Sequence, residues 1–199
     1  MSEKKTAVNI FGWLITILIP PILLMMSIRL VISPAFAQLE YKMPGFPEDP
    51  FGLTLDERLR WSEPAINYLL NNEDISYLFV LQFDDGEPIF NDRELTHMQD
   101  VKEVVTGMRI GLAIGMIGLL TATYFAVRKG SKAFALSAYR RGAWGLIGLI
   151  AAVLLFVALS FNDLFTWFHK LFFEDGTWQF YTSDTLIRLF PMRFWRDAF

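Results

Sequence analysis

The chain has 199 residues, of which 53% are hydrophobic, and it carries a formal net charge of −3. This length is normal for one domain, and the mean hydropathy of +0.34 is high for a soluble protein. The sequence contains no cysteine, which excludes a thiol nucleophile and a thiolate metal site.

The apolar residues are gathered into long runs. Three of these runs approach or exceed the roughly 20 residues needed to cross a hydrocarbon core: Val8 to Ile32, Val104 to Val127 and Ala143 to Phe161. They predict an integral membrane protein that is mainly α-helical, with three transmembrane helices.

The first transmembrane helix is expected within residues 1–33, with a kink at Pro20-Pro21 because proline lacks a backbone donor. A cleaved signal peptide is the alternative, because Ala35-Phe36-Ala37 resembles a cleavage site. The 25-residue apolar run is long for a signal peptide and contains Arg29, which favours an uncleaved anchor.

The charges of the connecting segments predict the orientation. The linker from Arg128 to Arg141 carries five basic residues and no acid, whereas Ser33 to Glu103 holds 15 acidic against 5 basic residues. By the positive-inside rule, the N-terminus and the basic loop are cytoplasmic, and the acidic segment and the C-terminal tail lie outside. The net charge is an average over these two faces and predicts no nucleic-acid partner.

Residues 34–103 are expected to form a small mixed α/β extracytoplasmic cap. Its proline-rich first part, Pro34 to Pro50, predicts an irregular excursion. Leu55 to Leu70 has helical spacing, and Ser76 to Phe83 is a strand candidate followed by an Asp84-Asp85-Gly86 turn.

A long helix is predicted to begin beside Asn91 and Glu94, which have the spacing of a capping box. It would continue into the second transmembrane helix. The expected boundaries beyond the cap are residues 104–127 for that helix, 128–142 for a basic cytoplasmic loop, 143–162 for the third transmembrane helix, and 163–199 for an aromatic extracytoplasmic tail that completes the cap.

The two histidines of the chain lie at matched distances from these spans. His97 comes seven residues before Val104, and His169 comes seven after Asn162. If both helices continue, each imidazole lies roughly 10 Å above the core at 1.5 Å per residue. Asp100 and Arg93 share a helical face with His97, and a carboxylate beside an imidazole suits general-base chemistry.

Two alternatives remain open at this point. Both histidines could be ordinary interfacial residues, or His97, Asp100 and His169 could hold a metal ion with water in the fourth place. The sequence has no metalloprotease, nucleophile-elbow, phosphate-binding or dinucleotide motif. The residues therefore indicate acid–base chemistry on an amphiphile at the outer leaflet, without a covalent nucleophile.

Several local motifs, in the same order along the chain, resemble the bacterial lipoprotein intramolecular transacylase family. The resemblance covers about half the chain. It rests on Thr96-His97-Met98-Gln99-Asp100-Val101-Lys102, Trp167-Phe168-His169-Lys170-Leu171-Phe172-Phe173, Gly176-Thr177-Trp178-Gln179-Phe180, Asp184-Thr185-Leu186-Ile187-Arg188-Leu189-Phe190-Pro191 and Phe194-Trp195.

The resemblance implies a membrane enzyme with an extracellular cap, and with catalytic histidines in an aromatic pocket where cap meets membrane. It implies transfer of the sn-2 acyl chain of a lipoprotein diacylglyceryl-cysteine to the α-amino group of that cysteine, giving a lyso-form lipoprotein. The diacylated lipoprotein N-terminus is then the substrate, in contact with membrane lipid, and no cofactor or metal is implied. His97 and His169 are the expected catalytic residues, with Asp100, Arg93 and Trp178 as supporting residues.

The family pattern continues after Phe-Trp into a fourth membrane helix, and this sequence ends at Phe199. The expected localisation is the bacterial cell membrane, as a multi-pass protein. The alternative function is a non-catalytic membrane protein whose acidic cap binds a partner or a cation. A cap that held the two imidazoles far apart would favour that alternative.

Overall fold

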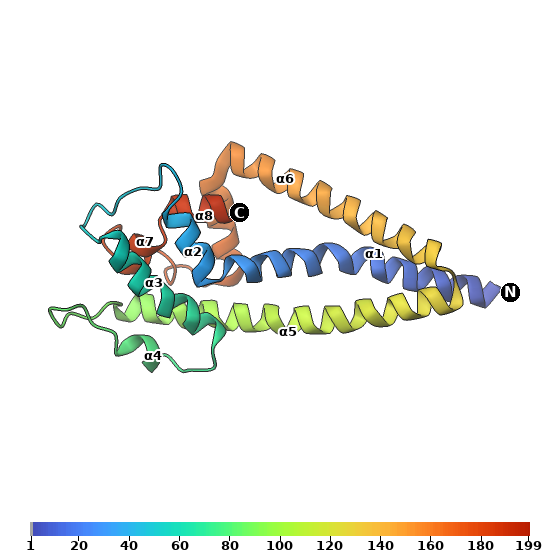
Figure 1. Ribbon diagram of the computed structural model, residues 1–199, viewed down its shortest axis with the longest axis horizontal. Helices are drawn as coiled ribbons and strands as arrows, with labels where there is room; N and C mark the ends of the chain where they lie inside the picture. Colours follow the sequence, from blue (N-terminus) through green and yellow to red (C-terminus); the bar gives the residue numbers. More distant parts are fainter. Residues whose placement is uncertain (1) are drawn as a thin grey trace. The chain divides into compact units, whose positions relative to one another are not determined.

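The computed structural model describes residues 2–199, with side chains from residue 9 onward. Within this range the chain is mainly helical (Figure 1). In chain order the helices are α1 Ser2–Val31, α2 Pro34–Tyr41, α3 Leu55–Leu70, α4 Ser76–Phe79, α5 Asp92–Lys129, α6 Lys132–Phe172, α7 Thr185–Leu189 and α8 Met192–Ala198. The chain divides into two compact units.

The first unit comprises α1 as far as Arg29 and residues 108–155. Its core holds alanine, leucine and isoleucine side chains from α1, α5 and α6: Ile15, Ile19, Ile22, Leu119, Ala122, Ala126, Ala135 and Ala138. Gly142 marks a close approach between helices, since a Cβ there would lie 2.9 Å from the carbonyl oxygen of Thr16. Small residues of this kind let helices pack tightly in lipid.

Three helices are long and apolar enough to cross a membrane: residues 9–31 of α1, α5 and α6. Most of their large apolar side chains are exposed, as expected for surfaces that face lipid. These helices confirm the predicted class of integral, mainly helical membrane protein. α6 already begins at Lys132, so most of the expected basic loop is helical.

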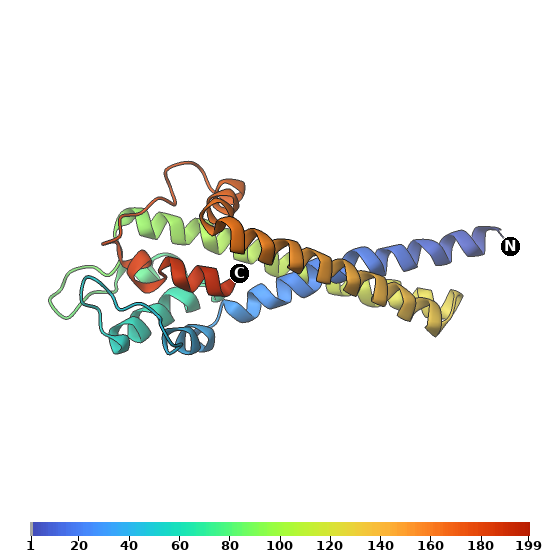
Figure 2. The same cartoon turned by 90° about the horizontal axis from the view of Figure 1, so that it is seen from above.

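The second unit comprises residues 30–107 and 156–199. Figures 1 and 2 show α8 beside α2, and α7 beside α3. These short helices enclose a separate core, which includes Tyr41, Trp61, Ile89, Leu189 and Phe194. Residues from both ends of the sequence therefore build the cap.

Local sequence signals start two of its helices. Thr54 and Glu57 form a capping box at α3, in which the Thr54 N–H donates to Glu57 Oε2 (2.8 Å). Asn91 and Glu94 do the same at α5, where the Asn91 N–H donates to Glu94 Oε2 and the Glu94 N–H donates to Asn91 Oδ1. The capping box predicted for α5 is confirmed.

Two expectations for the cap are wrong. Residues 34–41 form helix α2, because Ser33 caps it and Pro34 suits the first helical position. Residues 76–79 form helix α4, and the described cap contains only an isolated bridge between Gln82 and Pro88. The Asp84-Asp85-Gly86 turn does form, with Gly86 at φ +89°, but it joins no β-hairpin.

α6 is interrupted by a kink at Ser160, which has the non-helical angles φ −159° and ψ 75°. The Ser160 hydroxyl donates a hydrogen bond to the carboxylate of Asp163, three residues further along the chain. A helix that continued straight to His169, as the sequence argument assumed, does not occur. The short segment after Ser160 is the one that carries His169.

Candidate active site

His97 lies in the second turn of α5, ahead of the apolar stretch that begins near Val104. Its side chain is buried, with 8% of the residue exposed. Its Nδ1 atom has no hydrogen-bond partner among the described residues. Burial, with a smaller contribution from His169, lowers the pKa of His97 to about 4. The imidazole is therefore neutral at neutral pH.

His169 lies on the part of α6 that follows Ser160. Its Nδ1 donates a hydrogen bond to the backbone carbonyl of Phe165, at 2.8 Å. In the neutral ring this bond leaves Nε2 with its lone pair, so Nε2 is a hydrogen-bond acceptor and a base. Burial lowers the pKa of His169, and the bond to Phe165 partly offsets that effect.

The two imidazoles face each other with ring centroids 6.1 Å apart and an interplanar angle of 20°. Phe173 contacts both rings, at 4.9 Å from His97 and 5.6 Å from His169. Phe180 contacts His97 at 5.2 Å. Two basic side chains are thus brought together inside a wall of aromatic rings, an apolar setting in which charge interactions are strong.

Arg93 holds the segment that carries Phe180. Its guanidinium pairs with Asp184 (Nη2 to Oδ2, 2.5 Å) and lies 5.5 Å from the Phe180 ring and 4.9 Å from the Tyr181 ring. Arg93 therefore positions one wall of the histidine site and does not itself bond to either imidazole.

Glu94 joins α5 to α7, a contact that the sequence did not predict. This carboxylate is 1% exposed and accepts a hydrogen bond from the backbone N–H of Leu186, at 2.6 Å. Burial raises its pKa, against the opposing effect of the bonds from Leu186 and Asn91. Glu94, which caps α5 one turn before His97, thus also holds the start of α7.

Among the described residues, Asp100 has no hydrogen bond to either histidine. Burial and the neighbouring acids Glu103 and Glu174 raise its pKa, which is the opposite of what an imidazolium partner would do. Among the described residues no three His, Asp or Glu side chains are grouped as metal ligands, so the alternative set of His97, Asp100 and His169 is not assembled.

Trp178 lies directly beside His169, with ring centroids 4.9 Å apart and an interplanar angle of 34°. Its Nε1 atom is buried and has no hydrogen-bond partner among the described residues. The sequence did not predict that this buried N–H would lack a hydrogen-bond acceptor.

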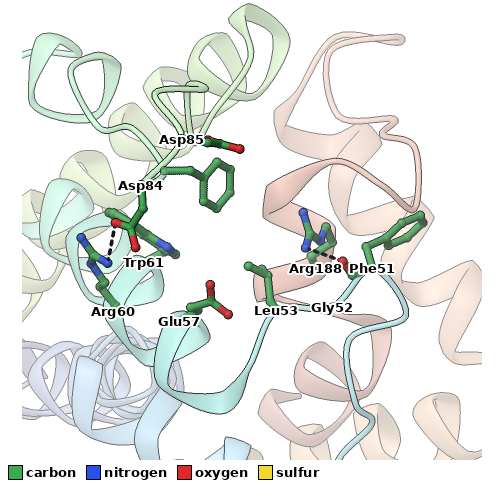
Figure 3. Close-up of a pocket in the computed structure, with 10 residues that line it drawn as sticks. Phe51, Gly52, Leu53, Glu57, Arg60, Trp61, Asp84, Asp85 and Arg188 are labelled. Carbon is green, nitrogen blue, oxygen red and sulfur yellow. Dashed lines mark hydrogen bonds and ion pairs between the residues drawn. The ribbon is translucent and has the colours of Figure 1, made fainter.

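A solvent-open pocket of the cap lies away from the histidines. Figure 3 shows this pocket of about 420 Å³, which is open to solvent and lined by Phe51, Gly52, Leu53, Glu57, Arg60, Trp61, Phe83, Asp84, Asp85 and Arg188. Its two arginines already have partners: Arg60 pairs with Asp84 at 3.2 Å, and Arg188 pairs with Asp49 at 2.9 Å. It contains neither histidine, and the chemistry argues for the aromatic site instead.

Residues 13–195 match the family model of the lipoprotein intramolecular transacylase Lit. This chain belongs to the Lit family. An uncharacterized protein of Aquifex aeolicus (strain VF5) is 29% identical over 194 residues, which are 96% of this chain and 85% of the relative.

Solved structures of Lit from Bacillus cereus share the Lit fold with this chain. One, solved in meso, superposes with a TM-score of 0.65 at 18% identity, over 96% of this chain and 85% of the other. Another, of a form with one histidine replaced by alanine, gives 0.69 at 20% identity, over 99% and 84%. Membership of the Lit family makes this chain a transacylase-like enzyme of a bacterial membrane that acts on lipoproteins.

Proposed function

We propose that this Lit-family enzyme moves the sn-2 acyl chain of a diacylglyceryl-cysteine lipoprotein to the α-amino group of the same cysteine, using His97 and His169 for acid–base catalysis. The observation that carries the proposal is the facing pair of buried imidazoles, 6.1 Å apart, in a site lined with phenylalanine. A separated pair would have favoured a non-catalytic role. Apolar walls suit a substrate that presents acyl chains.

The reaction needs no nucleophile from the enzyme. The substrate's amine nitrogen attacks the ester carbonyl carbon, a C–N bond forms, and the carbonyl π electrons move to oxygen. As the intermediate collapses, the bond from that carbon to the sn-2 glycerol oxygen breaks. The amine loses one proton and the glycerol oxygen gains one, so the products are an amide and a free hydroxyl.

The fixed tautomer of His169 suits the first proton transfer. Its Nε2 has the lone pair that takes the amine proton, because Nδ1–H is committed to the Phe165 carbonyl. An α-amino group has a pKa near 7.7–8.0 in model peptides, so a neutral base beside it keeps it nucleophilic. His97 gives its N–H proton to the glycerol oxygen as the C–O bond breaks. The proton that His169 took from the amine then passes to His97, so that both imidazoles end neutral.

We further propose that the N-terminus faces the cytoplasm and that the cap and the histidine site face outward. The support is the excess of acid in residues 33–103 and of base in residues 128–141. A diacylated lipoprotein N-terminus in the outer leaflet then lies at the level of the site.

A positionally labelled substrate tests the transfer. The purified protein is given a synthetic lipopeptide with an ordinary palmitoyl chain at sn-1 and a deuterated palmitoyl chain at sn-2, and the product is fragmented by mass spectrometry. The proposal predicts deuterated palmitoyl on the cysteine nitrogen and none on the sn-2 oxygen. An N-acetylated lipopeptide is the control and should not react. Release of the labelled chain as free acid, or transfer of the unlabelled chain, would contradict the proposal.

A further inference from the structure

We propose that Trp178 is a catalytic residue whose indole N–H donates a hydrogen bond to the carbonyl oxygen of the acyl group in transfer, and to the oxyanion that this oxygen becomes. The inference rests on the proposed function. The two histidines act at the amine nitrogen and at the glycerol oxygen. Trp178 supplies the hydrogen bond to the carbonyl oxygen, which neither histidine makes.

The first support is an unsatisfied atom. Trp178 Nε1 is buried and has no hydrogen-bond partner among the described residues. An indole N–H is a donor only, and a buried tryptophan N–H usually finds an acceptor. Because the described part of the chain supplies none, the missing acceptor must come from outside the protein, as a substrate oxygen does.

The second support is the place of the Trp178 ring. The Trp178 ring lies 4.9 Å from the His169 ring, centroid to centroid. His169 Nε2 is an acceptor, because Nδ1 donates to Phe165. A ring that carries a hydrogen-bond donor therefore lies against a ring that carries a proton acceptor. Attack of an amine on an ester requires both, the donor at the carbonyl oxygen and the acceptor at the amine nitrogen.

The third support is the lack of another donor among the neighbouring rings. The described rings in contact with His97 and His169, apart from the histidines themselves, are Phe165, Phe168, Phe173, Phe180 and Trp178. Within this set only Trp178 carries an N–H. Since burial keeps both imidazoles neutral, neither offers a resident cation to the developing oxyanion. A neutral donor in an apolar wall can supply the stabilisation.

The test compares the purified full chain with Trp178→Phe and with Trp195→Phe, using the diacylated lipopeptide. Trp195 is a matched control, since its ring contacts Phe165 at 6.3 Å and touches neither histidine. Removal of one oxyanion donor lowers kcat by roughly 10²- to 10³-fold. We expect that loss in Trp178→Phe with KM changed less than about threefold, and near-normal kcat in Trp195→Phe.

A transition-state mimic separates this role from a structural one. A lipopeptide with a phosphonate in place of the sn-2 ester presents a tetrahedral anionic oxygen. The unmodified protein should bind it more tightly than Trp178→Phe does, by a factor similar to the loss in kcat. If Trp178→Phe does not fold, the same comparison is made with β-(3-benzothienyl)alanine at position 178, which keeps the shape of the ring and lacks the N–H.

The outcomes distinguish this inference from the proposed function. If the unmodified protein fails to move the sn-2 chain, the proposed function fails. If it moves the chain, and the variant lacking the N–H retains kcat within about threefold or binds the phosphonate equally well, the role of Trp178 is overturned and the histidine mechanism stands.

Discussion

At the scale of single residues, catalysis in this site depends on what burial does to two imidazoles. His97 is 8% exposed, and His169 is fixed by its bond to the Phe165 carbonyl. The pKa of each lies below the ordinary value of 6.5, so both are neutral bases at neutral pH. In the range between about 4 and 6.5 the unfolded chain binds more protons than the folded one. The stability that the buried neutral His97 contributes is therefore present above 6.5 and is lost as the pH falls toward 4.

Direct titration of the rings tests this account. The chain has only two histidines, so a sample labelled with ring-¹³C histidine gives one set of resonances for each. We expect a midpoint of about 4 for His97 and one below 6.5 for His169. His169→Asn assigns the two sets. Midpoints near 6.5 for both rings would mean that solvent reaches them freely.

At the scale of elements, Glu94 joins the beginning of α5 to the beginning of α7. Its carboxylate accepts from the Asn91 N–H and from the buried Leu186 N–H. In Glu94→Ala the Leu186 donor loses its partner, which costs on the order of 1–3 kcal/mol. We expect a lower melting temperature in detergent and reduced activity, because α7 follows directly on the segment that Arg93 holds beside His97.

Glu103→Ala provides the control for this prediction, since Glu103 is an exposed glutamate on the same helix. It should melt like the unmodified protein. Equal melting temperatures for the two variants would show that Glu94 does not stabilise the cap.

The packing of the apolar helices makes a separate prediction at Gly142. A Cβ at this position would lie 2.8 Å from Ile19 and 2.9 Å from the Thr16 backbone oxygen, whereas one at Gly148 would meet nothing within 4 Å. Gly142→Ala should therefore force α6 away from α1 and lower the melting temperature, and Gly148→Ala should leave it nearly unchanged. The same effect in both variants would indicate that the close approach at Gly142 is not important for stability.

The elements that sequence predicts well are those set by local chemistry. Hydropathy located the three apolar helices, and the Asn91 and Glu94 spacing located the start of α5. The break at Ser160 escaped prediction because it lies within a continuous apolar pattern, and residues 149–161 contain neither proline nor glycine to mark it. The strand expected at Ser76 to Phe83 is helix and turn. Leu78 is buried in the cap core and Leu81 packs against it, at helical spacing, whereas Phe79 and Val80 are exposed.

In the candidate site, too, only some features could be predicted from the sequence. The pairing of His97 with His169 was expected from equal distances along straight helices, and the rings do meet although α6 is not straight. The bond from Leu186 to Glu94 and the orphaned Nε1 of Trp178 join residues distant in sequence or depend on the surroundings of one atom. No spacing rule predicts such features.

At the scale of the whole molecule, the orientation in the membrane is open to a simple test, because the chain has no cysteine. We expect Asp85→Cys, in the cap turn, to react with a membrane-impermeant maleimide on intact spheroplasts. Ser131→Cys, between α5 and α6, should react only after permeabilisation. The reverse pattern would place the cap in the cytoplasm and separate the site from an outer-leaflet substrate.

The most direct test of the central claim is mass spectrometry of the N-terminal peptide of a reporter lipoprotein. The peptide is taken from bacterial cells that express this chain, or its His97→Ala or His169→Ala form, at matched levels in the membrane. We predict an N-acyl, mono-O-acyl cysteine with the unmodified chain, and a diacylglyceryl cysteine with a free amine in both variants. Continued N-acylation in either variant would contradict two-histidine catalysis, and a reporter that stays diacylated with the unmodified chain would contradict the proposed transfer itself.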